Sequence, residues 1–249
     1  MMKRTHVILS ALFIIIFWEI LARIVALPVL PSPLSVFNAL LSDIGGELGE
    51  HFLASLWRVL ASVTLAILLA VPLGLILGQS ERLNKLISPS IYLLYPIPKV
   101  VLVPIILLFL GVGNLSKITI IFLILFFQIL LLVRDQAAAI RPELIHSVSS
   151  LGAGRRALFR FVYLPASLPA ILTALRQSIG LAVAVLYITE LVATQRGLGY
   201  YIYLQGSTLF DYPRMYAGVV AMSLLGLGLY FIVDGLERRL CPWKFVGTS

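Results

Sequence analysis

The 249-residue chain is 60% hydrophobic and only 12% charged, and its mean hydropathy of +1.03 exceeds what a water-soluble domain of this size needs to fill its core. The net charge of +8 does not indicate a nucleic-acid partner, because the basic residues border apolar stretches and form no soluble patch interleaved with aromatic residues. One cysteine and three scattered histidines exclude an internal disulfide and offer no metal site. The sequence therefore predicts an all-α polytopic membrane protein whose main solvent is the lipid bilayer.

Six apolar stretches are long enough to cross the membrane, since a helix needs about 20 residues to cross a hydrocarbon core of about 30 Å. No soluble domain is left over, so we expect one transmembrane domain over residues 1–249. The basic start imitates a signal peptide, but Trp18, Glu19 and Arg23 interrupt the first stretch and no small-x-small cleavage site follows, so we expect this span to be retained. The spans are expected at about 7–28, 55–78, 87–110, 118–133, 168–193 and 215–233.

The basic residues predict the orientation, because short cytoplasmic loops hold an excess of Lys and Arg. With the N-terminus inside, only Lys117, Arg196 and Arg214 of the 19 basic residues fall in external loops. We therefore expect both termini to be cytoplasmic. The basic residues on the inner side are then Lys3, Arg4, Arg82, Lys85, Arg134, Arg141, Arg155, Arg156, Arg160, Arg238, Arg239 and Lys244.

Charged groups within a span need a partner or a watery cavity. Glu19 and Arg23 are four residues apart and are expected to pair on the first helix. Lys99 follows Pro96 and Pro98 in the third span, where missing backbone donors should break the helix. Broken helices in the membrane often line pathways, and an ammonium there can attract an anion; alternatively, it snorkels or pairs with an acidic group. Lys99 and Pro98 are therefore candidate pathway residues.

Three further polar side chains, Arg58, Arg176 and Glu190, are candidate pathway or gate residues within or near the ends of spans. Arg176 and Glu190 cannot pair with each other, because fourteen residues of helix separate them by about 21 Å. Glu190 can shape an external gate or hydrogen-bond the Gly-rich turn that follows it. The two arginines can also serve as headgroup or inter-helix anchors.

The long basic segment 134–167 is expected to form a cytoplasmic elbow. A short amphipathic helix should begin near Pro142, because the apolar residues from Leu144 to Leu151 share one helical face. Gly152 can take the left-handed conformation that ends this helix. A second helix is expected at about 155–164, with the prolines at 165 and 169 starting the next span at an angle.

The run Leu151-Gly152-Ala153, followed after a gap by Leu164-Pro165, resembles the cytoplasmic signature loop of ABC importer permeases, whose pattern is EAA, two residues, LGA and later I-x-L-P. His146, Ser147 and Val148 stand where that family has EAA, so an acidic contact would have to come from Glu143. Other stretches in the same order resemble the nitrate, sulfonate and taurine group. They are Leu30-Pro31-Ser32-Pro33, Ser55-Leu56-Trp57-Arg58-Val59-Leu60, Ile97-Pro98-Lys99 with Pro104, Phe109-Leu110-Gly111-Val112-Gly113, Thr189-Glu190 and Gly197-Leu198-Gly199.

The resemblance implies a type I ABC importer permease fold in a bacterial cytoplasmic (inner) membrane. In that family the loop forms a coupling helix that sits in a groove of the ATP-binding subunit. The implied partners are this subunit, a second permease copy that forms a homodimer with the first, and a periplasmic or lipid-anchored substrate-binding protein. The implied coupling residues are Glu143, His146, Ser147, Leu151, Gly152, Ala153, Leu164 and Pro165.

ATP hydrolysis is expected in the partner, because a phosphate-binding loop needs a Gly-Lys pair and the chain has none. The chain is thus expected to be no enzyme and to bind no cofactor, with ATP and Mg²⁺ held by the partner. The expected cargo is a small anion such as a sulfonate, taurine or nitrate, and the alternative is a vitamin precursor. Two other classes are an ATP-independent secondary transporter or channel, which gives no reason for the elbow, and a membrane-embedded enzyme, whose acidic residues should cluster more than they do here.

Overall fold

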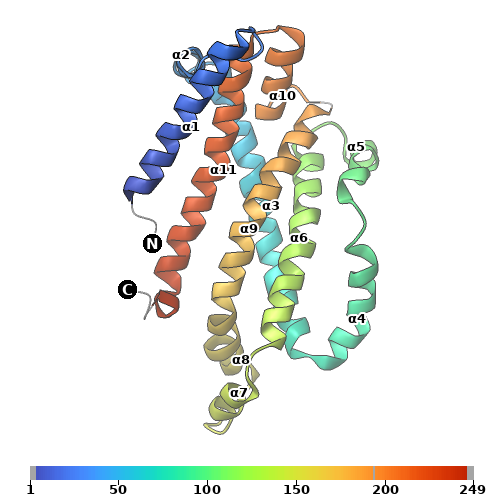
Figure 1. The fold of residues 1–249 in the computed structure, drawn as a ribbon. Coiled ribbons are helices and arrows are strands. Elements are labelled where there is room, and N and C mark those ends of the chain that lie inside the picture. Colours follow the sequence, from blue (N-terminus) through green and yellow to red (C-terminus); the bar gives the residue numbers. More distant parts are fainter. Residues whose placement is uncertain (1–3, 193, 246–249) are drawn as a thin grey trace. The chain divides into compact units, whose positions relative to one another are not determined.

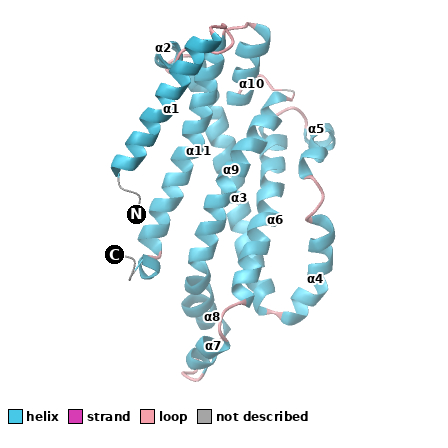
Figure 2. Cartoon of the chain, in the orientation of Figure 1, coloured by secondary structure: helices cyan, strands magenta, loops and turns pink. Residues whose placement is uncertain are grey.

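The computed structural model describes residues 4–192 and 194–245. These residues form helices and connecting turns without a strand (Figure 2). Lys3, one of the basic residues expected on the inner side, and Ala193, the last residue of the fifth expected span, lie outside this part. The chain divides into two compact units. Unit 1 combines Met1–Leu56 with Glu190–Leu225, and unit 2 combines Trp57–Thr189 with Gly226–Ser249.

In the described part, five helices are long and apolar enough to cross a membrane, and a bent pair supplies a sixth span if it is counted as one. This agrees with the predicted all-α architecture of six spans. The single helices are α1 (Arg4–Val25), α3 (Glu47–Gln79), α6 (Asn114–Ala138), α9 (Leu164–Leu191) and α11 (Tyr212–Leu240), and the bent pair consists of α4 (Glu81–Leu94) followed by η1 (Lys99–Leu102) and α5 (Val103–Leu110) (Figure 1).

Most of these helices extend beyond the apolar stretches that predicted them. Helix α3 begins at Glu47 where the span was expected to begin at residue 55, and α6 and α11 are longer at both ends. Hydropathy marks only the apolar middle of such a helix. Glu47 and Glu50 lie in the first turn of α3, where negative charge interacts favourably with the helix dipole and extends the helix into polar sequence.

Unit 1 contains α1, α2 (Pro33–Asp43), α10 (Leu198–Tyr203) and η3 (Leu204–Thr208). The Ser32 hydroxyl caps α2 by accepting a hydrogen bond from the Ser35 N–H. The buried Tyr201 hydroxyl donates to Asp43 over 2.6 Å and so ties α10 to the end of α2. On α1, Glu19 and Arg23 form the predicted ion pair.

In unit 2, α6 lies alongside α3 and α9 (Figure 1). Its buried side chains Ile121, Leu125, Ile129 and Val133 recur every four residues and form one inward stripe. Two glycines of α3 lie against this helix. A Cβ atom at Gly74 would lie 2.9 Å from the Val133 Cβ, so α3 and α6 are in close contact because no side chain separates them.

Candidate functional site: the elbow and the polar groups of the spans

The elbow begins with α7 (Pro142–Ser149), which carries Glu143 in its first turn. Gly152 adopts φ +83°, and its N–H donates to the carbonyl oxygen of Ser149. This left-handed residue ends the first helix as predicted, since residues with a Cβ rarely take this conformation. The chain then enters α8 (Arg155–Leu158).

The second half of the elbow differs from the prediction. Helix α8 continues through η2 (Phe159–Tyr163), a π-helical turn, directly into α9, so that Arg156–Leu191 forms one continuous helix. The expectation that Pro165 starts the span at an angle is therefore wrong. Proline has no N–H to donate, and the wider π-helical turn precedes it, with the Leu164 N–H donating to the Phe159 carbonyl.

Much of the elbow surface is uncovered in this chain. Leu151 is 85% exposed and Leu144 is 52% exposed, whereas Ile145 and Val148 are half-buried. Helix α7 contacts α8 and η2, and an apolar hollow of about 290 Å³ beside α7 also borders Trp243. Of the implied coupling residues, Glu143, His146, Ser147, Leu151 and Gly152 are exposed, and Ala153, Leu164 and Pro165 are half-buried.

Lys99 lies at the break between α4 and α5, where the two segments meet at 74°. The break that Pro96 and Pro98 predicted is therefore present. The Lys99 ammonium donates to the carbonyl oxygens of Leu94 and Tyr95, and its Nζ lies 4.7 Å from the centre of the Phe127 ring. Through these contacts the ammonium caps the C-terminal end of α4.

Arg58, in unit 2, is buried, and its Nε donates to the Asn114 side-chain oxygen over 2.8 Å. In α3 the nearby Ser62 hydroxyl donates to the Arg58 carbonyl, so both ends of this residue are engaged. The guanidinium thus connects α3 to the start of α6. This contact corresponds to the inter-helix anchor that the sequence offered as one alternative.

Glu190, in unit 1, is fully buried, and both carboxylate oxygens accept from the Ser55 hydroxyl at 2.9 Å. One of them also accepts from the Gly199 N–H, which is the predicted contact with the Gly-rich turn. The Ser55 oxygen in turn accepts from the Leu198 N–H, and His51 Nδ1 accepts from the Gly197 N–H. Neither Ser55 nor His51 was assigned a role of its own from the sequence, although the two residues are four apart on one face of α3.

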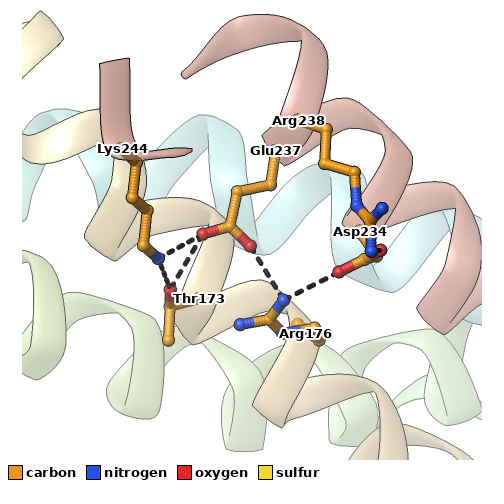
Figure 3. Close-up of polar contacts among 6 residues, drawn as sticks. All are labelled: Thr173, Arg176, Asp234, Glu237, Arg238 and Lys244. Atoms are coloured by element: carbon orange, nitrogen blue, oxygen red, sulfur yellow. Dashed lines mark hydrogen bonds and ion pairs between the residues drawn. The ribbon is translucent and has the colours of Figure 1, made fainter. Parts of the chain in front are cut away.

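Arg176 lies in an ion-pair network between α9 and the end of α11 (Figure 3). Its Nη1 atom lies 3.0 Å from Asp234 and 2.9 Å from Glu237. Lys244, in η4 (Pro242–Phe245), also pairs with Glu237, whose side chain is 1% exposed. Sequence reasoning missed both acids, yet two carboxylates three residues apart at the end of an apolar span are a signal for an internal cationic partner.

The comparisons with known proteins decide the family. The family described as "Binding-protein-dependent transport system inner membrane component" matches residues 70–242. The chain belongs to this family. It is therefore a permease component of an ABC transport system and a multi-pass membrane protein, as the elbow motif predicted.

Individual relatives agree with this membership. The chain is 30% identical over 240 residues to the taurine transport system permease protein TauC of Escherichia coli K12, covering 94% of this chain and 87% of that protein. It is 30% identical to the formylaminopyrimidine transport permease protein ThiX of Halalkalibacterium halodurans, covering 98% and 99%. It is 28% identical to the putative aliphatic sulfonates transport permease protein SsuC of Bacillus subtilis, covering 93% and 84%.

Solved structures show the same fold. The inward-facing MetNI methionine ABC transporter matches with a TM-score of 0.66 at 19% identity, covering 78% of this chain and 95% of that one. A bacterial ABC transporter involved in the import of the acidic polysaccharide alginate matches with a TM-score of 0.62 at 17% identity, covering 95% and 96%. The predicted type I ABC importer permease fold is thereby confirmed.

Proposed function

We propose that residues 1–249 act as one permease domain and that two copies together form the translocation pathway of an importer. A separate subunit binds ATP and Mg²⁺ and hydrolyses the nucleotide, and a soluble or lipid-anchored binding protein delivers the solute. The family description, with its binding protein and inner membrane, supports this assembly. The excess of basic residues on one side supports cytoplasmic termini in a bacterial inner membrane.

The geometry of the elbow is the observation that best supports this proposal. In its helix–Gly152–helix geometry, the exposed side chains of Leu144 in α7 and of Leu151 in the turn after it lie beside a helix that runs unbroken to Leu191. Exposed apolar side chains next to a rigid helix suit docking onto a partner subunit. We assign this surface to the ATP-binding subunit, with Glu143, His146 and Ser147 on the exposed polar side and Ala153, Leu164 and Pro165 at the base of the elbow.

The proposed cargo is a small anion such as a sulfonate, taurine or nitrate. The relatives TauC and SsuC are described as taurine and aliphatic sulfonate permeases. The Lys99 ammonium at the break after Pro98 supplies positive charge within the bent span, and we assign it to the pathway. We also propose Arg58, Arg176 and Glu190 as residues that hold the pathway or its gate in shape through the contacts described above.

A vitamin precursor is the second candidate cargo. The relative ThiX is a formylaminopyrimidine permease, and a riboflavin permease, RibX of Chloroflexus aurantiacus, is 31% identical over 238 residues. Uptake of radiolabelled taurine and riboflavin, measured side by side with each candidate binding protein, separates the two cargo classes.

Reconstitution tests whether uptake requires a separate ATP-binding subunit. Vesicles containing this chain alone are expected to show no concentrative uptake of the solute retained by its binding protein. Adding the co-purifying ATP-binding subunit, ATP and the binding protein should start uptake. A variant of the ATP-binding subunit that binds but does not hydrolyse ATP is the control. Uptake by the chain alone, without nucleotide, refutes the proposal in favour of a secondary transporter.

A further inference from the structure

A hollow of about 400 Å³ with a partly polar lining lies in unit 2, between residues of α6 and α9 and Lys244. Its volume falls within the range of small-molecule sites, which is about 300 to 1,000 Å³. The coupling elbow and the Lys99 break do not use this hollow. It therefore requires its own explanation.

The lining combines one cation with neutral polar groups and small apolar ones. Lys244 is the charged member among the described residues that line the hollow. Exposed carboxamides come from Gln136 of α6 and Gln177 of α9, and Ala166 and Ala170 supply small apolar surface. A cation with amide donors suits an oxyanion, and the alanines suit a short aliphatic group.

The positive charge of Lys244 is only partly neutralised by its neighbours. Figure 3 shows a row of alternating charges in the order Lys244, Glu237, Arg176, Asp234 and Arg238. Lys244 ends the row at the hollow, and its carboxylate partner Glu237 is shared with Arg176. The end of the row that reaches the hollow therefore keeps part of its positive charge and attracts an anion.

Lys244 also has a donor to spare. An ammonium has three N–H groups, and those of Lys244 contact one oxygen of Glu237 and the Thr173 hydroxyl. The side chain is 40% exposed, so a third N–H can reach a ligand. If Lys244 turned towards a ligand, the buried Glu237 carboxylate would still have a cationic partner, because Arg176 Nη1 lies 2.9 Å from the other Glu237 oxygen.

We propose that this hollow binds a small oxyanion with a short aliphatic part, held by Lys244, Gln136 and Gln177. The inference deepens the proposed anion import, on which it rests, by adding a site for the solute on α6 and α9. The same chemistry occurs in the phosphate of an anionic phospholipid headgroup, so the experiment has one arm for each source.

The test uses the purified full-length chain in nanodiscs of phosphatidylcholine, with ethanesulfonate as the probe and calorimetry as the readout. Replacing Lys244 by Gln (Lys244→Gln) should weaken binding about 10-fold, because a charge-assisted contact is lost. Arg238→Gln is the matched control: it removes the same charge from the other end of the row and should leave binding nearly unchanged. Gln177→Ala provides a second variant at an exposed position, and it should also weaken binding.

The second arm uses nanodiscs that contain phosphatidylglycerol, with retained lipids counted by native mass spectrometry. Retention that depends on Lys244, without ethanesulfonate binding, supports the oxyanion site and assigns it to a lipid headgroup. The inference is overturned if the chain binds neither probe, or if the Lys244 and Arg238 variants lose binding equally. ATP-driven uptake by the assembled transporter is measured separately, so normal uptake by the Lys244→Gln transporter refutes a solute site in this hollow and leaves the proposed function standing.

Discussion

The Lys99 ammonium lies at the bend after α4, where it can both cap the end of that helix and contact an anion in the pathway. At the bend after α4 the Leu94 carbonyl oxygen accepts from the Ile97 N–H, and the Lys99 ammonium donates to the carbonyl oxygens of both Leu94 and Tyr95. Two of its three donors are thereby used, so the remaining donor and the net charge can act on a passing anion. A capping role and a pathway role are thus compatible, and substitution can distinguish their effects.

Lys99→Ala should reduce uptake of an anionic solute by the assembled transporter about 10-fold, because the charge-assisted contact is lost. Lys99→Arg keeps the charge and should retain much of the uptake. Lys85→Ala, at an exposed position paired with Glu81, is the matched control and should transport normally. Transport is normalised to the amount of assembled complex. Normal uptake by the Lys99→Ala transporter would remove this residue from the pathway.

We expect Tyr201 to make the stability of the chain sensitive to alkaline pH. Burial and the hydrogen bond to Asp43 both raise the pKa of its phenol above the ordinary value of 10.0. The folded chain therefore keeps this proton at a pH where the unfolded chain has lost it. The contribution of this phenol to the free energy of unfolding is fully present below about pH 10. It is lost as the pH rises from the pKa of the unfolded chain towards the higher pKa of the folded chain.

Tyr201→Phe should therefore lessen the fall of the thermal unfolding midpoint between about pH 9 and 11. Unfolding is followed by circular dichroism of the detergent-solubilised chain. Tyr203→Phe, on the same helix but at an exposed position, is the control and should follow the native pH profile. If the native chain and the Tyr201 variant lose stability in parallel, other groups cause the alkaline sensitivity.

At the scale of elements, the α3–α6 contact depends on small residues. A Cβ atom at Gly78 would lie 2.5 Å from the Arg134 carbonyl oxygen and 2.6 Å from the Ala137 Cβ. The first of these atoms is part of the α6 backbone and the second is bonded directly to it, so neither can move aside unless the helix moves. The two helices would have to separate along their shared surface.

Gly78→Ala should consequently destabilise the chain by about 1 to 3 kcal/mol, the usual cost of overpacking a tight core. The measurement is unfolding by increasing denaturing detergent, with helix content as the signal. Gly180→Ala is the matched control: this glycine also lies within a span, but a Cβ there would meet nothing within 4 Å. Equal stability of the two variants would show that the α3–α6 contact tolerates a methyl group.

The helices and the break in the third span could be predicted, because hydropathy and proline act locally. The π-helical turn before Pro165 could not be predicted. It depends on how the backbone hydrogen bonds rearrange around proline, which has no N–H, while the helix stays continuous. The partners of Arg176 were equally hidden. Asp234 lies 58 residues further along the chain, so their contact depends on the packing of α9 against α11 and on no local pattern.

At the scale of the whole molecule, the elbow is suited to passing on displacement. Its second helix is continuous from Arg156 to Leu191, so movement at the base is transmitted along hydrogen-bonded backbone. Gly152 fixes the direction in which α7 leaves that helix. The geometry of one residue thus sets how a docked subunit would move a membrane span.

Replacing Gly152 by Ala should lower the uptake obtained per ATP hydrolysed. A residue with a Cβ at φ +83° costs roughly 1 to 2 kcal/mol, so α7 would leave this geometry. Gly154→Ala is the matched control, because a Cβ also fits there without a contact within 4 Å and φ is not left-handed. ATP hydrolysis and solute uptake are measured on the same vesicles, after membrane insertion has been shown to be normal. We expect hydrolysis to persist in the Gly152 variant while uptake falls, whereas a normal ratio of uptake to hydrolysis would mean that coupling does not require the left-handed residue.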